Sequence, residues 1–169
     1  MADSILTAER LREVVDYDPD TGVFIRKVRL AQRHQVGDRA DFVVTGGGLK
    51  GYRRVSLFSQ RYLAHRLAWL YVHGSWPKHE IDHINGNPGD NRIENLRDVV
   101  TAVNSQNKRK ARADNRSGFL GVTTHAPGIY RASLYLNGKR IHDGLYGTPE
   151  AAHAAYIEAK REFHPGCEI

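Results

Sequence analysis

The sequence predicts an α+β protein built from small modules, and three observations lead to this conclusion. Short strand-like segments are separated by turn signals, of which Asp18-Pro19-Asp20-Thr21-Gly22 and Asn137-Gly138 are the strongest. Helical segments begin at capping threonines, Thr7 and Thr148, and the second is followed by Pro149 at the first helical position. A length of 169 residues allows one ordinary domain or two to three small modules.

In the first half of the chain, caps and turns set the order of the elements. A short helix is expected after Thr7, with Leu11, Val14 and Val15 on one face. The turn at residues 18–22 leads into a strand, residues 29–50 are expected to be irregular, and Gly46-Gly47-Gly48 marks a flexible loop. The expected elements after the first helix are a strand at Val23 to Lys27, a hairpin of Gly51 to Phe58 and Arg61 to Ala64 that turns at Ser59-Gln60, and a helix from His65 to His73 that ends at Gly74.

In the second half, a basic polar linker at Ala111 to Gly118 is the best candidate domain boundary. Beyond it, three short strands are expected at Leu120 to Thr124, Tyr130 to Leu136 and Arg140 to Tyr146. Asn137-Gly138 joins the last two strands in a type I′ turn. The last helix is expected to run from Pro149 to about Phe163, with a small-residue face of Ala151, Ala152, Ala155 and Ala159 against the sheet.

Composition narrows the classes of partner and site. The formal net charge is +6, and residues 101–140 alone carry eight basic side chains against one acid, Asp114, so a polyanionic partner is favoured. The single cysteine, Cys167, excludes an intrachain disulfide and a cysteine-based zinc site. There is no apolar run long enough for a membrane span, and Met1 to Arg12 lack an apolar signal core. We therefore expect an intracellular, cytoplasmic protein.

The segment from Glu80 to Asn107 carries the residues suited to chemistry. Asp82-His83 is expected on a strand, Glu94 to Val99 on a second strand, and Thr101 at the cap of a helix that presents Asn104 and Asn107 on one face. Phosphodiester hydrolysis needs an activated water and a cation at the phosphate. A neutral histidine can take the proton of the water, and aspartate and asparagine oxygens suit Mg²⁺.

This segment resembles the HNH nucleases, whose ββα-metal finger consists of two strands and a helix, in the subgroup of phage and intron homing endonucleases. The shared elements are Asp82-His83, the run Asp90-Asn91-Arg92-Ile93-Glu94-Asn95-Leu96, and Thr101, Asn104 and Asn107 at the family spacing. The resemblance implies Asp82 and Asn104 as metal ligands, His83 as general base and Asn95 as the residue that orients His83. Asn104 occupies the position where the third letter of the family name stands for histidine, and the subgroup shares this asparagine. Such an oxygen-donor site favours Mg²⁺ or Mn²⁺ over zinc.

Other polar residues near this motif keep two interpretations each. Loop-building caps explain the following residues at least as well as catalysis does: Asn85, Asn87, Asp90, Asn91 and Arg92. Asn107 is placed equally well in active-site packing or in a DNA contact. Arg66 is a candidate for a phosphate contact or for a structural salt bridge, His65 is a weaker candidate for catalysis, and Trp69 is expected in the core.

The C-terminal part resembles the Apetala-type (ethylene-response-factor-like) DNA-binding domain over residues 116–164. The resemblance rests on four segments: Ser117 to Val122, Tyr130-Arg131-Ala132, Gly138 to Ile141, and Thr148-Pro149-Glu150. It implies a three-stranded antiparallel sheet in the DNA major groove, backed by one helix, and a sheet suits that groove. The chain lacks the strand tryptophan common in the plant domains, so individual base contacts are not carried over.

Strand alternation selects the residues expected to face DNA. Arg131, Ser133 and Tyr135 share one face of the second strand, while Tyr130, Ala132 and Leu134 form the core face. The expected neighbours on the DNA face are Thr123, His125, Lys139, Arg140 and His142. The basic run Lys108, Arg109, Lys110 and Arg112 is expected to follow phosphates, a contact that positions a protein without reading sequence.

The sequence therefore predicts a modular endonuclease that acts on double-stranded DNA, homing or phage-encoded, with no membrane and no obligate protein partner evident. The expected parts are an N-terminal region (1–74), the catalytic finger (75–110), a basic linker (111–115) and a DNA-reading domain (116–169). Two rivals remain: a sequence-specific regulator with an inactive HNH fold, and an interaction protein that contacts DNA incidentally. The target sequence, the oligomeric state and the number of strands cut stay open.

Overall fold

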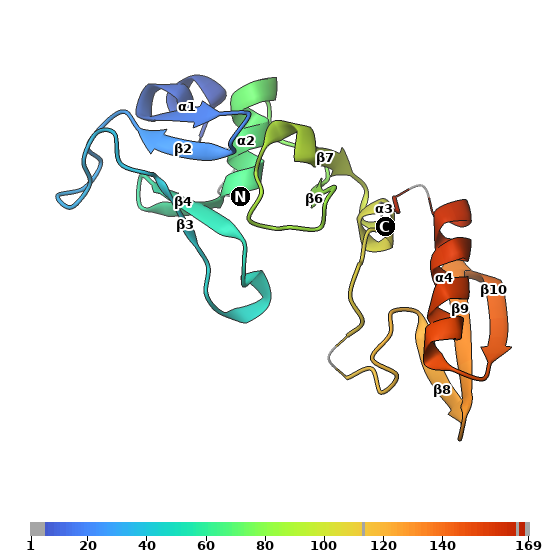
Figure 1. Ribbon diagram of the computed structural model, residues 1–169. Helices are drawn as coiled ribbons and strands as arrows, with labels where there is room; N and C mark the ends of the chain where they lie inside the picture. The colour runs from blue at the N-terminus through green and yellow to red at the C-terminus, as the bar shows by residue number, and fades with distance from the viewer. Residues whose placement is uncertain (1–5, 113, 165, 168–169) are drawn as a thin grey trace. The chain divides into compact units, whose positions relative to one another are not determined.

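The computed structural model describes residues 6–112, 114–164 and 166–167 (Figure 1). Residues 1–5 of the charged N-terminus, residue 113 of the predicted linker, and residues 165, 168 and 169 of the predicted C-terminal domain lie outside the described residues. The chain divides into two compact units, Met1–Thr101 and Ala102–Ile169, which are described in turn. Within the described part, no helix combines the length and the apolar character that crossing a membrane requires.

The first unit combines two helices with short antiparallel sheets. Its elements in chain order are α1 Ala8–Val14, β1 Val15–Asp18, β2 Val23–Arg26, β3 Asp41–Val43, β4 Arg53–Leu57, β5 Gln60–Leu63, α2 Ala64–His73, β6 Glu80–His83 and β7 Leu96–Val99. Strand β1 pairs with β2, the strands β3, β4 and β5 form a second sheet in that order, and β6 pairs with β7. Single 3₁₀ turns lie at Gly47–Leu49 and Ile93–Asn95.

The predicted start of α1 and the predicted end of α2 are confirmed, whereas α2 begins at Ala64, one residue before the predicted His65. The Thr7 hydroxyl accepts a hydrogen bond from the Arg10 N–H at 3.2 Å, which satisfies one of the free donors at the start of α1. Helix α2 ends at Gly74 in the left-handed conformation, with a φ of 75°. Both helices therefore begin or end where the local chemistry of the sequence indicates.

Three predictions about the strands of this unit were wrong. Val15 does not continue the first helix but opens β1, where it pairs with Arg26. The stretch predicted to be irregular contains β3, because Asp41–Val43 pairs with β4 far along the chain. The hairpin turns one residue earlier than expected, at Phe58 and Ser59, which have positive φ values of 49° and 64°.

One apolar core holds the first unit together and carries the β6–β7 hairpin. Its side chains come from every layer of the unit, and those almost fully buried include Leu11, Val15, Phe24, Val55, Leu57, Leu67 and Leu70. Ile81 of β6 and Leu96 of β7 belong to the same cluster, and Trp69 packs against it partly buried. The hairpin is thus anchored by one residue of each strand, which fixes the neighbouring polar side chains.

The second unit is a three-stranded antiparallel sheet with a helix, preceded by a short helix. Its elements are β8 Val122–Ala126, β9 Ile129–Leu136, β10 Lys139–Tyr146 and α4 Pro149–Phe163, with the short helix α3 Thr101–Gln106 at the junction of the two units. The sheet order is β10-β9-β8. Asn137 and Gly138 both have positive φ, 50° and 77°, as a type I′ turn requires.

The sheet and the helix α4 share a small core. Val122, Ala132 and Leu134 of the sheet are buried together with Ala152, Tyr156 and Ala159 of α4. The predicted helix face is therefore only partly right, because Ala151 is exposed and the aromatic Tyr156 lies in the contact. The strands β6 and β7 and the helix α3 follow one another in the predicted order, and their arrangement as a metal finger stays a prediction.

The contact between Gly121 and Tyr156 gives a test of this core. Gly121 has a φ of 75°, and a Cβ there would lie 2.1 Å from a ring carbon of Tyr156. Gly121→Ala is expected to lower the free energy of unfolding of the second unit by at least about 3 kcal/mol, because it adds overpacking to backbone strain. Gly128→Ala is the matched control, since Gly128 has a similar φ of 71° and open space around it; it should cost only about 1 kcal/mol.

Hydrogen exchange of the β8–β10 amides, followed by mass spectrometry, measures both changes in the full chain. Equal losses of protection in the two variants would show that backbone strain alone matters and that α4 does not pack as described.

Candidate active site

The β6–β7 hairpin places Asp82 and His83 next to each other in the interior of the first unit. In its antiparallel register, Asp82 lies opposite Arg97, and His83 lies opposite Leu96. Asp82 and His83 are only 6% and 5% exposed. Buried charges and imidazoles need partners, so the contacts of these two side chains indicate what the site can do.

Asp82 is paired with Arg97 on the opposite strand. The Arg97 Nε and Nη2 atoms lie 2.9 and 2.8 Å from the Asp82 Oδ2 atom. The guanidinium balances the buried carboxylate, whose isolation would be strongly destabilising. Arg97 was not predicted from the sequence. Pairing the two predicted strands residue by residue could have placed this basic side chain opposite Asp82.

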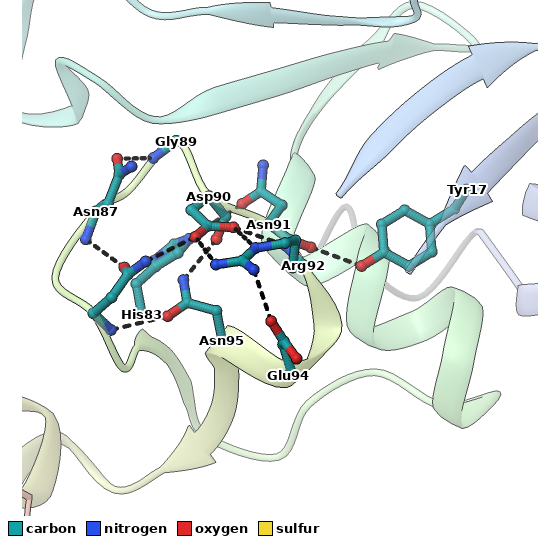
Figure 2. Close-up of polar contacts among 10 residues, drawn as sticks. Tyr17, His83, Asn87, Gly89, Asp90, Asn91, Arg92, Glu94 and Asn95 are labelled. Atoms are coloured by element: carbon teal, nitrogen blue, oxygen red, sulfur yellow. Dashed lines mark hydrogen bonds and ion pairs between the residues drawn. The ribbon is translucent and has the colours of Figure 1, made fainter. Parts of the chain in front are cut away.

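His83 is oriented by Asn91. The His83 Nε2 atom lies 3.1 Å from Asn91 Oδ1, and Asn91 is 1% exposed. The backbone carbonyl of Asn91 accepts a hydrogen bond from the hydroxyl of Tyr17, a core residue, at 2.7 Å (Figure 2). The core of the unit therefore fixes the position of Asn91. An amide oxygen only accepts hydrogen bonds, hence Nε2 donates and the lone pair of the neutral imidazole lies on Nδ1.

Asn95, the residue expected to orient His83, instead closes the loop between the strands. Its Oδ1 atom accepts a hydrogen bond from the Asn85 N–H at 2.9 Å. Its Nδ2 atom donates to the Asp90 backbone carbonyl at 2.8 Å, as Figure 2 shows. Asn95 is 5% exposed. Its contact with the loop brings Asn91 back toward His83, so its effect on the imidazole is indirect in this structure.

Asp90 is the centre of the loop. One carboxylate oxygen accepts from Arg92 Nε at 2.9 Å, and the other accepts from Asn85 Nδ2 at 2.7 Å and from Arg92 Nη2 at 2.8 Å. The hydrogen bonds from Arg92 lower the pKa of Asp90 from its ordinary 3.8 to about 2. Asn87 caps the turn by accepting from the Gly89 N–H. The loop-building interpretation is therefore confirmed for Asn85, Asn87, Asp90 and Arg92, whereas the side chain of Asn91 contacts His83.

Two further rings enclose His83. The ring centroids of His65 and Tyr52 lie 5.1 and 5.8 Å from that of His83, and 5.5 Å from each other. His65 is 5% exposed, and its Nδ1 atom is buried without a hydrogen-bond partner. Burial lowers the pKa of His65 to about 3 and also lowers the pKa of His83, with Asn91 and Asp82 opposing the second shift. Both imidazoles are thus neutral at pH 7.

The residues here match a hard divalent cation in kind. Within the described residues, no group of three or more His, Cys, Asp or Glu side chains is placed to hold a metal ion. Mg²⁺ needs few protein ligands, however, because it keeps several waters and takes one or two carboxylates. Asp82 supplies one buried carboxylate, which it shares with Arg97. Asn104, the second expected ligand, lies half-buried on α3 in the second unit.

Other predicted contact residues are spread over both units. In the first, Arg66 donates to the His79 carbonyl at 3.3 Å, and its guanidinium lies 5.8 Å from the centre of the Trp76 ring. In the second, Asn107 is 6% exposed, and its N–H donates to the Asn104 carbonyl. Arg109 is half-buried. The other basic residues of the run line a groove of about 730 Å³ together with Arg116; these residues are Lys108, Lys110 and Arg112.

The sheet face predicted to read DNA is open to solvent. Tyr135 is 50% exposed, and Arg131 and Ser133 are half-buried on the same side of β9, whereas Ala132 and Leu134 point into the core. Lys139 and Arg140 lie exposed at the start of β10. The alternation predicted for β9 is confirmed.

Comparison with known proteins finds a match over the segment that contains the β6–β7 hairpin. Residues 62–106 match a family model described as HNH endonuclease. This HNH segment runs from β5 to α3 and contains Asp82, His83, Asn95 and Asn104. It indicates a nuclease with DNA as its substrate. No curated protein and no solved structure matches the chain, so the Apetala-type resemblance stays a prediction.

The unpartnered nitrogen of His65 predicts how the first unit responds to acid. The pKa of His65 is lower in the folded state than in the unfolded chain, so the unfolded chain binds more protons below about pH 6.5. The free energy of unfolding therefore decreases as the pH is lowered. His65→Phe keeps a ring and removes the titrating nitrogens. Between pH 7 and pH 5, the free energy of unfolding of His65→Phe should fall by roughly 1–2 kcal/mol less than that of the wild type. At pH 7 the variant should be at least as stable as the wild type.

Urea unfolding followed by tryptophan fluorescence measures this, because Trp69 and Trp76 both lie in the first unit. An unchanged slope of stability against pH in His65→Phe would contradict the buried neutral state of His65.

The loop around Asp90 gives a second stability test. Asp90→Asn should lower the free energy of unfolding of the first unit by about 1 kcal/mol at pH 7, because it removes the charge that Arg92 binds. The pKa of Asp90 is depressed in the folded state, so the difference from wild type should shrink as pH falls from about 5 toward 2. The matched control is Glu94→Gln, which removes a more exposed partner of Arg92 and should cost under about 0.5 kcal/mol. Equal effects of the two variants would show that the loop does not depend on Asp90.

Proposed function

We propose that this protein is a metal-dependent DNA endonuclease of the HNH type, whose C-terminal sheet selects the site of cleavage. The observation that carries the proposal is the buried Asp82-His83 pair, with His83 held by Asn91, inside a segment that matches the HNH endonucleases. A buried neutral imidazole with one nitrogen fixed is the arrangement that a general base needs.

In this mechanism His83 takes a proton from the attacking water. The bond from Nε2 to Asn91 puts the lone pair of the neutral imidazole on Nδ1, and burial lowers the pKa of His83, which keeps the ring neutral at pH 7. As the imidazolium forms, the carboxylate of Asp82 beside it and the amide oxygen of Asn91 stabilise the positive charge. The resulting hydroxide forms a bond to phosphorus in line with the P–O3′ bond, which breaks. The products are a 5′-phosphate and a 3′ oxygen that takes a proton from solvent to become a hydroxyl.

Asp82 is the residue of the first unit that would hold the cation, Mg²⁺ or Mn²⁺. Asn104 as a second ligand is what the resemblance to the HNH nucleases implies. Bound there, a divalent cation supplies electrostatic stabilisation of the charge on the phosphate and on the leaving oxygen. Arg97 holds the Asp82 carboxylate in place from the opposite strand.

The second unit binds DNA in this proposal. The groove of about 730 Å³ suits a phosphate backbone, because the basic side chains of Lys108, Lys110 and Arg112 all line it. The open face of the sheet suits the major groove, as the Apetala-type resemblance implies. The residues proposed to contact DNA are Arg66, Asn107, Lys108, Arg109, Lys110, Arg112, Arg131, Ser133, Tyr135, Lys139 and Arg140. A homing or phage-encoded origin follows from the subgroup resemblance and belongs to the same proposal.

One observation favours the rival function of a DNA-binding regulator with an inactive HNH fold. The Asp82 carboxylate is already paired with Arg97, as a structural ion pair would be. Cleavage assays separate the two functions, because the regulator would bind DNA without cutting it.

The deciding experiment compares nicking of supercoiled plasmid by wild type, His83→Ala and His79→Ala in Mg²⁺ or Mn²⁺. His83→Ala is expected to lose roughly 10²–10⁴ in rate, the usual contribution of a general base, with DNA binding retained. His79→Ala is the matched control from the residue before β6, with a side chain 49% exposed, and should nick at nearly the wild-type rate. EDTA should abolish nicking by every variant.

Absence of nicking by wild type with either metal, over several plasmids, would contradict the nuclease and favour the regulator. Loss of DNA binding together with activity in His83→Ala would mean that His83 has a structural role instead.

A further inference from the structure

The open face of the C-terminal sheet carries an acid among its basic residues. In the register of β9 and β10, Ser133 lies opposite Asp143, Tyr135 opposite Arg140, and Arg131 opposite Leu145. Asp143 is the only acidic residue in the sequence between residues 115 and 149. It therefore stands alone in a segment whose other charged side chains are basic.

Asp143 holds two arginines at once. Its two carboxylate oxygens accept from Nε and Nη2 of Arg131, both at 2.7 Å, in a fork-to-fork pair. One of these oxygens also accepts from Nη1 of Arg140 at 2.9 Å. These hydrogen bonds lower the pKa of Asp143 to about 2, so it is ionised at neutral pH. A planar guanidinium bound at two atoms has its orientation fixed.

Tyr135 completes the arrangement on the side of Arg140. Its hydroxyl accepts from Nε and Nη2 of Arg140 at 3.0 and 2.8 Å, and the guanidinium carbon lies 5.4 Å from the centre of its ring. Ser133 adds a hydrogen bond to Asp143 at 3.3 Å. Residues from both strands thus join in one network, Arg131–Asp143–Arg140–Tyr135, on the face that the proposed function assigns to DNA.

We propose that Asp143 is a specificity-determining residue, which fixes the guanidinium groups of Arg131 and Arg140 so that they read base edges in the major groove. This inference rests on the proposed function of the sheet. The side chains of Arg131 and Arg140 are 35% and 40% exposed, so both remain accessible while they are held. Arg131 uses two of its five N–H donors on Asp143, and the donors at the Nη1 end remain to meet the paired acceptors O6 and N7 of guanine.

A carboxylate at this place works against binding in general. It lies among the cations that attract phosphates, and it lowers the positive potential of the face. If the acid only balanced charge, its removal would strengthen non-specific binding and leave the discrimination between sequences intact. An acid that orients two arginines gives opposite signs: its removal strengthens non-specific binding and weakens discrimination between sequences.

The test uses the full chain in EDTA, so that no strand is cut, and a library of random 20-base-pair duplexes. Wild type and Asp143→Asn are each taken through rounds of selection, and the enriched and scrambled duplexes are then titrated. Asp143→Asn is expected to bind scrambled duplex about threefold to tenfold more tightly at low salt. Its preference for the enriched sequence should fall about tenfold or more, the discrimination that one well-oriented pair supplies.

Two further variants isolate the cause. Asp114→Asn makes the same charge change on an exposed acid that pairs with Arg112 in the groove, so it should raise non-specific affinity and keep the wild-type preference. Arg131→Lys keeps the charge and removes the fork, so it should lose the preference without a gain in non-specific affinity. Arg131→Lys also tests the proposal if Asp143→Asn disturbs the sheet.

The outcomes separate the inference from the function beneath it. A wild-type chain that enriches no sequence overturns the role of the sheet in choosing a site. A wild-type chain that enriches a sequence, with Asp143→Asn and Arg131→Lys preferring it equally, leaves that role standing and overturns the role of Asp143.

Discussion

The structure depends on the register of β6 and β7, which buries a carboxylate and an imidazole side by side on one strand. Each group is costly to bury alone, and each has its own compensation. Arg97 lies opposite Asp82 in the ladder, and Asn91 reaches back from the loop to His83. The loop between the strands is therefore part of the site. Hydrogen bonds of Asp90 and Asn95 hold the loop in the conformation that places Asn91 beside His83.

The local chemistry of the sequence predicted much of the fold. Thr7, Gly74, Thr148 and the Asn137-Gly138 turn each set a boundary through bonds to neighbouring residues, and the structure places these boundaries as expected. Strand β3 was missed because it is only three residues long and its partner lies across a long loop. Pairing of that kind depends on tertiary contacts that no local pattern records.

The candidate site was predictable in its residue types and less so in its contacts. Asp82 and His83 stand out because the spacing of the later asparagines matches the HNH pattern, and the family match covers the same segment. The partner of His83 was assigned to Asn95, whereas Asn91 makes the contact. Four asparagines lie between residues 85 and 95, and only the backbone path of the loop decides which of them faces the imidazole.

The proposed role of His83 depends on Asn91, which fixes it as a neutral imidazole with its proton on Nε2. Long-range proton–nitrogen NMR of ¹⁵N-histidine-labelled protein at pH 7 measures the tautomer and charge of this ring directly, with His83→Gln identifying its signal. The contact between His83 and Asn91 predicts a protonated Nε2 and an unprotonated Nδ1 in the folded chain. A proton on Nδ1 alone, or on both nitrogens, would contradict it, because His83 would then have no lone pair placed to accept a proton from water.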